Sequence, residues 1–415
     1  MIVRSFFGNG LFKFTNEKTL VEPFNQNYMR LTPFFKLSIL LFLTTLISFA
    51  SNGKPNKKLR IEINKNVELL GIGYFIGYEG VDIETKTVEI NGKKIPKKDW
   101  HNYGFWIYEK YKSFATSENL GKSFAVADHL WLDYLISLLL QVDDFPHAKL
   151  KESIDQSYYI NFSKTKDLQE AKKNVTIFLD GMNEFYKEIE LDKYFIESDK
   201  FYKKAIDEIN SVLPKQDFIG AMEKFYNKKF DSYTLIPSLT IPKGMGFGVR
   251  YTTDKKTHVL NVFGSLDFQE FLNTPEMKMG FANEKKLREL SVHEFGHSFV
   301  NPEVDKLPKE KFLQTESLFE PLKSKMSDQG YNTWKVCVYE HFVRAGEILI
   351  AEKLGDTEGA KRLHAEYEQD RKFVYIPAIL VELKKYDKGS YKTYYDAVLG
   401  SMEELARNHG DTKAQ

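Results

Sequence analysis

The chain has 415 residues, 42% of them hydrophobic and 28% charged, with 59 basic side chains against 58 acidic ones. This balance argues against nucleic acid as the main partner, and the apolar content excludes a disordered chain. The single cysteine, Cys337, excludes an intramolecular disulfide. The fold must therefore be held by its core and by any metal that it binds.

The first 50 residues are predicted to be a leader rather than part of the fold. Leu37–Ala50 is an uncharged stretch that follows Lys36 and ends in small residues. It is shorter than the roughly 20 residues of a membrane span, and its flanks are typical of a signal peptide cleaved near Ala50. Because 28 residues precede a signal of ordinary length, we predict that translation starts at Met29.

The mature chain is therefore expected to be secreted or periplasmic and not an integral membrane protein. Removing the leader leaves 54 basic against 56 acidic side chains, a net charge of −2. No polybasic segment remains that would favour a membrane surface or nucleic acid.

The mature chain alternates between strand-like and helical patterns. Residues 59–98 look strand-like, with a hairpin turn at Asn91-Gly92, and residues 102–230 look helical. Strand character returns over 233–266, as a hairpin around Asp254-Lys255-Lys256, and everything after Asn283 looks helical.

These patterns predict a mostly helical α+β protein. A small sheet is expected between an N-terminal helical lobe and a C-terminal helical lobe. The predicted divisions are the leader, 1–50, an N-terminal region of strands and helices, 51–230, and a catalytic region, 231–415.

The second helical lobe opens with the sequence NEKKLRELSVHEFGHSFVNP, which contains His293-Glu294-Phe295-Gly296-His297. On a helix, residues four apart lie on one face, so both imidazoles can bind one zinc ion. Glu294 is then placed to take a proton from water that zinc activates. Asn301-Pro302 is expected to end this helix.

A catalytic zinc needs a third protein ligand. The segment 334–355, WKVCVYEHFVRAGEILIAEKLG, is predicted to be a largely buried helix with a charged stripe of Glu340, Arg344 and Glu347. Buried charges persist when they are paired or bound to metal, so Glu340 is our preferred ligand, with Arg344 as a supporting or oxyanion-binding cation. The alternative is an ion-pair stripe on the helix surface.

The sequence offers two other positions for a third ligand. Asp305 lies eight residues past His297, but the metzincin pattern is excluded because Val300 and Glu303 occupy its glycine and histidine positions. Glu352 and Asp356 have the thermolysin-like E-x-x-x-D spacing, but Gly355 looks like a helix C-cap and makes a shared helical face doubtful.

HEFGH followed by YEHFVRA resembles the gluzincin metallopeptidases, whose third ligand is a glutamate on a second helix. The strings ELLGIGYFIGY, HEFGHSFVNP and YEHFVRA are similar to an uncharacterised family of secreted Bacteroidetes proteins regarded as zinc peptidases. The resemblance implies a zincin-like fold with zinc bound by His293, His297 and Glu340. Arg344 stands where thermolysin has an aspartate, so support for the histidines must come from elsewhere, with Asn301 and Asp305 as candidates.

The expected function is that of a secreted zinc metallopeptidase acting on a peptide or protein, with Glu294 as general base. Tyr375, His341 and Tyr339 are candidates for the transition-state donor, and Tyr375 is our choice. The hairpin 249–263 could pair with substrate or be purely structural. The alternative function is a secreted peptide- or glycan-binding protein with a structural or vestigial zinc site. The oligomeric state is left open.

Overall fold

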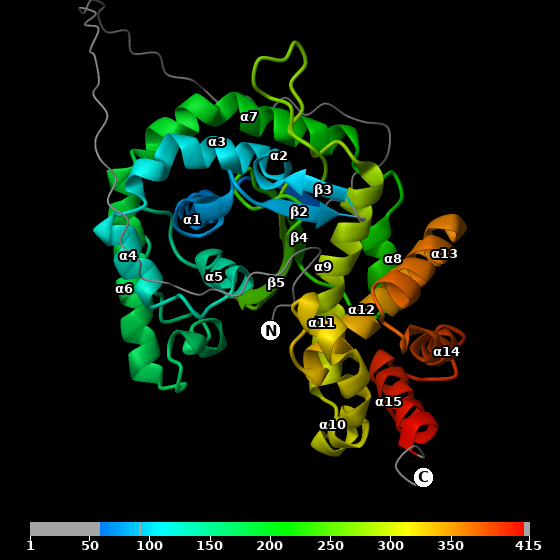
Figure 1. Cartoon of the computed structure of the whole chain (residues 1–415). Coiled ribbons are helices and arrows are strands. Elements are labelled where there is room, and N and C mark those ends of the chain that lie inside the picture. The colour runs from blue at the N-terminus through cyan, green and yellow to red at the C-terminus, as the bar shows by residue number, and fades with distance from the viewer. Residues whose placement is uncertain (1–58, 91–92, 411–415) are drawn as a thin grey trace, which may run out of the picture. The chain divides into compact units, whose positions relative to one another are not determined.

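The computed structural model, which describes residues 59–90 and 93–410, contains a four-stranded sheet that joins distant parts of the chain (Figure 1). Its strand order is β1 (Leu59–Ile61), β4 (Ser232–Pro237), β6 (Lys256–Phe263) and β5 (Gly246–Thr253). β4 runs parallel to both of its neighbours, whereas β5 and β6 form an antiparallel hairpin. Because β1 pairs with β4, this sheet connects the two regions on either side of residue 230.

The predicted fold class is confirmed, since 60% of the described residues are helical and they form a small sheet with helical lobes. The hairpin predicted around residue 255 is also confirmed: Thr253 is paired with Lys256, and both intervening residues, Asp254 and Lys255, have positive φ. This backbone geometry matches the right-handed twist of the flanking strands. The predicted leader lies outside the described residues.

The segment between β1 and β4 is mostly helical, as predicted for 102–230. Its elements are α1 (Lys65–Gly77), η1 (Glu79–Asp82), β2 (Thr87–Ile90), β3 (Lys93–Pro96), α2 (Lys97–Trp100), α3 (Asn102–Tyr111), η2 (Lys112–Phe114), α4 (Glu118–Ala125), α5 (Leu132–Leu139), η3 (Gln156–Tyr158), η4 (Ile160–Phe162), α6 (Leu168–Glu188), α7 (Leu191–Ser211) and α8 (Phe218–Phe225).

The segment after β6 is helical, again as predicted. Its elements are α9 (Glu284–Asp305), α10 (Lys309–Thr315), η5 (Glu316–Leu322), α11 (Lys323–Asp328), α12 (Trp334–Lys353), α13 (Thr357–Ala365), the short π-helix η6 (Glu366–Asp370), α14 (Ile376–Asp387) and α15 (Tyr394–Gly410). None of the helices in the described part of the chain combines the length and apolar character that a membrane crossing needs.

The strand-like reading of 59–98 was wrong for residues 65–77, which form α1. This helix is buried from Asn66 to Ile76 on all its sides, so its apolar residues show no helical periodicity. Asn64 caps it by accepting a hydrogen bond from the Val67 N–H at 3.0 Å. At Gly71 the helix touches the chain after β4, because a Cβ there would lie 2.4 Å from the Thr240 carbonyl oxygen.

The hairpin predicted at Asn91-Gly92 is confirmed by its strands. β2 and β3 pair antiparallel, with Ile90 opposite Lys93. The two turn residues themselves lie outside the described part of the chain.

Candidate metal centre

Helix α9 carries the two histidines and passes beside α12 and strand β5 (Figure 1). Asn283 caps its start by accepting from the Lys286 N–H at 3.0 Å. His293 and His297 are 0% and 4% exposed, so this part of the helix faces the protein interior.

The expected end of α9 at Pro302 was wrong, because the helix continues to Asp305. Proline has no N–H to donate to the carbonyl four residues earlier, which here is that of Ser298. The Arg250 side chain of β5 replaces that donor, with Nη1 donating to the Ser298 oxygen at 3.0 Å. This hydrogen bond from β5 satisfies the Ser298 carbonyl, and the helix continues beyond Pro302.

Helix α12 supplies the third group. Its predicted charged stripe is buried rather than on the surface, with Glu340 and Arg344 at 0% exposure and Glu347 at 3%. The surface alternative is therefore wrong, although Glu340 and Arg344 do form an ion pair at 2.8 Å.

His293, His297 and Glu340 come together as a buried group that could hold a metal ion. The two Nε2 atoms lie 3.3 Å apart, and Glu340 oxygens lie 3.4 Å from His297 Nε2 and 3.8 Å from His293 Nε2. Ligand atoms about 2.0–2.2 Å from a tetrahedral zinc ion would be about 3.3–3.6 Å from one another. The 3.3 Å and 3.4 Å separations lie in this range, and the 3.8 Å separation, to Glu340 Oε2, is slightly longer, so the three side chains are close enough to share one ion.

The outer ring nitrogens of both histidines are held by acceptors. His293 Nδ1 lies 3.1 Å from a Glu347 carboxylate oxygen, and His297 Nδ1 lies 3.3 Å from the Asn301 side-chain oxygen. Burial lowers the pKa of both imidazoles, which favours neutral rings with one proton each. With those protons on Nδ1, both Nε2 lone pairs face each other, an arrangement that a bound cation stabilises.

Asn301 was a predicted support, whereas the contact of Glu347 with His293 was missed. Glu347 lies seven residues after Glu340, two helical turns on the same face. The i, i+4, i+7 stripe marked it as important, but only the crossing of α9 and α12 reveals its partner. Burial raises the pKa of Glu347 to about 7, against the opposing effect of Arg344.

The Arg344 side chain is hydrogen-bonded to Glu340. It donates to Glu340 Oε2 at 2.8 Å and to the Tyr331 hydroxyl at 3.2 Å, and its guanidinium lies over the rings of Tyr367 and Phe373. Glu340 Oε1 is buried and accepts no hydrogen bond from the described residues. Arg344 therefore fixes one carboxylate oxygen and leaves the other for a metal, a supporting rather than substrate-facing position.

The charges of this buried cluster also fit a metal. Glu294, Glu340 and Glu347 provide three carboxylates, and Arg344 provides one buried positive charge. Among these side chains the carboxylates outnumber the guanidinium, and a bound cation would offset the excess negative charge. Buried charge is costly unless it is compensated, so this donor set suits a divalent ion.

The Glu294 side chain packs against β5, where two glycines leave room for it. A Cβ at Gly246 or Gly248 would lie 3.2 Å from a Glu294 carboxylate oxygen, and at Gly248 also 2.2 Å from the Glu294 backbone oxygen. Glu294 is 0% exposed. Glycine in this strand is therefore required by the close approach of α9.

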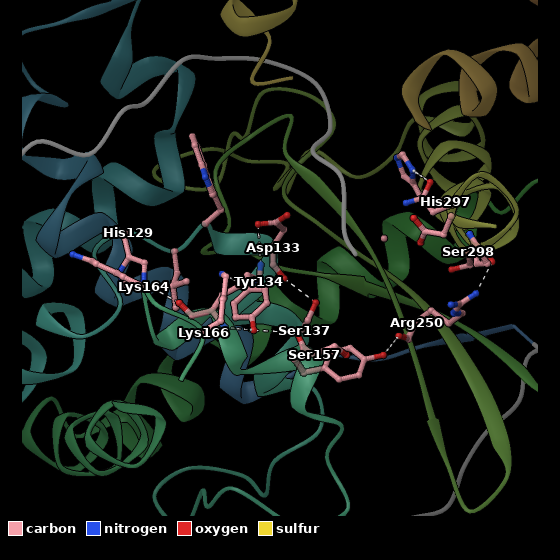
Figure 2. A pocket seen from close by; sticks show the side chains of 18 residues that line it. His129, Asp133, Tyr134, Ser137, Ser157, Lys164, Lys166, Arg250, His297 and Ser298 are labelled. Atoms are coloured by element: carbon pink, nitrogen blue, oxygen red, sulfur yellow. Dashed lines mark hydrogen bonds between the residues drawn. The ribbon is translucent and has the colours of Figure 1, made fainter. Parts of the chain in front are cut away.

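A pocket of about 660 Å³ reaches this centre at His297. Figure 2 shows His297, Ser298 and Arg250 on one side and His129, Lys164 and Lys166 on the other. Residues before β4 thus form one wall of the pocket. Sequence reasoning missed this wall, because single lysines in a loop carry no motif.

The predicted transition-state donors do not line this pocket. Tyr375 is buried and donates to the Leu318 carbonyl at 2.7 Å, and burial raises its pKa to about 12. His341 Nδ1 lies 2.8 Å from the Cys337 carbonyl oxygen, and the Tyr339 hydroxyl donates to Asp305. These contacts give no support to a catalytic role for any of the three.

The alternative ligands lie elsewhere. Asp305 contacts Lys335 at 2.6 Å and the Tyr339 hydroxyl, and it is not part of the three-residue group. Glu352 pairs with Lys384 at 3.1 Å and is exposed, while Asp356 caps α13. None of these three carboxylates belongs to the group that could hold the metal ion.

Fold and site together define an α+β protein with a buried two-histidine, one-glutamate centre that could hold a metal ion. Residues 59–399 match the family described as "Domain of unknown function (DUF4932)", and the chain belongs to this family. No curated protein and no solved structure matches the chain.

Proposed function

We propose that this protein is a zinc-dependent metallopeptidase, secreted or periplasmic as the leader predicts. The observation that carries the proposal is that the two Nε2 atoms and a carboxylate oxygen of Glu340 lie at separations suited to one tetrahedral ion. Two imidazoles and a carboxylate are a preferred zinc set, and three protein ligands leave a fourth position for chemistry.

Zinc bound there would supply Lewis-acid polarisation of the scissile carbonyl and would lower the pKa of water at the site. Glu294 would take the proton from that water and deliver it to the leaving amine. Glu347 and Asn301 hold the two histidine rings, and Arg344 holds Glu340, so these side chains orient the ligands.

The pocket supports a peptide substrate next to the centre. It is lined by Gly248 and Arg250 of β5, the end strand of the described sheet. The Tyr158 hydroxyl already donates to the Arg250 carbonyl at 2.5 Å, so a substrate backbone would reach this strand at Gly248 rather than at Arg250.

The test is Glu294→Gln in the full mature protein. Hydrolysis of a mixed peptide library should fall about 100- to 10,000-fold, while the zinc content, measured by elemental analysis, stays at that of the wild type. Glu284→Gln, an exposed position at the start of the same helix, serves as the matched control. A Glu294→Gln variant that keeps its full rate would refute the proposal. Zinc bound with no peptide cleaved by the wild type would favour the binding-protein alternative.

A further inference from the structure

The wall of the pocket opposite His297 is cationic. Lys164 and Lys166 lie there, across the pocket from Arg250, His297 and Ser298 (Figure 2). Both lysines belong to the short connection between η4 and α6, and both are exposed. Their ammonium groups can therefore meet a ligand without a large desolvation cost.

Hydrogen bonds to the buried Ser163 side chain stabilise the connection that carries these lysines. Ser163 is 0% exposed, and its Oγ accepts the backbone N–H groups of Thr165 at 3.2 Å and Asp167 at 3.0 Å. Lys166 has a positive φ of 64°, a conformation that is uncommon for a residue with a Cβ and persists where the surroundings impose it. Lys166 also donates to the Asn161 side chain. The backbone that carries both lysines thus has a defined conformation.

The acidic residues of the pocket do not cancel these charges. Asp305 is paired with Lys335 at 2.6 Å, and Asp133 is buried and accepts the Tyr134 N–H at 2.8 Å. Lys164 lies 3.7 Å from Asp128, an exposed contact of the kind that contributes little. Among the described residues, neither lysine forms a buried ion pair, so both ammonium groups can contact an anionic ligand.

The volume of the pocket gives an approximate scale for the distance between this wall and the candidate metal centre. A volume of about 660 Å³ corresponds to a sphere about 11 Å across, and an extended peptide rises about 3.3 Å per residue, so about three residues span it. Resting on the proposed peptidase function, we propose that Lys164 and Lys166 bind a substrate carboxylate about three residues from the hydrolysed bond. This carboxylate is either the C-terminus of a short peptide or an acidic side chain.

The test uses N-acetylated hexapeptide libraries in two matched forms, with a free C-terminal carboxylate or a C-terminal amide. A second pair of amidated libraries carries Glu or Gln at each position in turn. Cleavage by the zinc-loaded wild type, followed by mass spectrometry, should be about tenfold faster for the form with the carboxylate. A preference in the first pair identifies a C-terminus, and one in the second pair identifies a side chain.

The variant Lys164→Glu/Lys166→Glu should lose this preference, so that the two forms of each pair are cleaved at similar rates. Lys172→Glu/Lys173→Glu, two exposed positions on α6 outside the pocket, should keep it. Zinc-dependent cleavage that ignores the carboxylate in both pairs would overturn this inference and leave the peptidase proposal intact.

If no library is cleaved, the peptidase proposal fails. Peptide binding then tests whether Lys164 and Lys166 recognise a carboxylate. Fluorescein-labelled versions of the same peptides are then titrated with the wild type. About tenfold tighter binding of the carboxylate form, abolished in Lys164→Glu/Lys166→Glu, supports the lysine wall. Equal binding of both forms, or none, overturns it.

Discussion

Replacement of Glu68 by glutamine should remove a pH-dependent loss of stability. Glu68 lies in α1 with 0% exposure, and its Oε2 accepts from the Tyr202 hydroxyl at 2.7 Å. Burial raises its pKa from 4.5 to about 7, and hydrogen bonds from its neighbours oppose this shift only partly. The folded protein therefore holds the proton more tightly than the unfolded chain does.

The direction of the pH dependence of stability follows from this difference in pKa between the folded and unfolded states. Below pH 4.5 the carboxyl is protonated in both states, and its full contribution to stability is present. As the pH rises from 4.5 to about 7, the unfolded chain releases the proton while the folded protein keeps it, so the free energy of unfolding falls until the folded protein also ionises. Between pH 5 and pH 8 the loss from this group should be about 2 to 3 kcal/mol.

The assay is urea unfolding of the wild type and Glu68→Gln at pH 5 and pH 8. The variant should gain about 2 to 3 kcal/mol relative to the wild type when the pH rises, because an amide does not ionise. Glu118→Gln, whose side chain is 88% exposed, is the control and should follow the wild type. Equal pH dependence of wild type and Glu68→Gln would refute the reasoning.

Two further predictions concern the metal centre and its helix. Glu347→Gln should weaken zinc binding about 10- to 100-fold in a competition titration with a chelator, because a carboxylate no longer orients His293. Arg250→Met should lower the free energy of unfolding by about 1 to 3 kcal/mol, since the Ser298 carbonyl loses the donor that compensates for Pro302.

Each of these has a matched control. Glu352→Gln lies on the same helix as Glu347 but is exposed, so its zinc affinity should equal that of the wild type. Pro302→Ala restores a backbone N–H to the helix, so Arg250→Met should cost less in that background. Unchanged zinc affinity in Glu347→Gln, or additive effects of the Arg250 and Pro302 changes, would contradict the geometry described above.

The metal centre could be predicted from the sequence to the extent that its geometry is local. His293 and His297 are one helical turn apart, and the periodicity of 334–355 placed Glu340 on a buried stripe. Contacts between side chains of two crossing helices, such as that of Glu347 with His293, could not be predicted from the sequence. Tyr375 was chosen on chemistry alone, and its hydroxyl contacts Leu318.

The fold was predictable where one side of an element meets solvent. Residues 102–230 showed helical periodicity for this reason, whereas α1, buried on all sides, did not. The continuation of α9 through Pro302 depends on Arg250, 52 positions earlier in the chain, so local rules for proline predicted the wrong end.

The pairing of β1 with β4 has a consequence for how the chain folds. Leu59 lies opposite Tyr233, so 174 residues of sequence separate the two partners. At synthesis rates of about 5–20 residues per second, β1 emerges roughly 10 to 30 s before its neighbour exists. During that interval β1 has no partner strand, and the segment after β4 that contacts α1 at Gly71 does not yet exist. Native order in this sheet therefore arises late, and the growing chain passes through a period in which aggregation competes with folding.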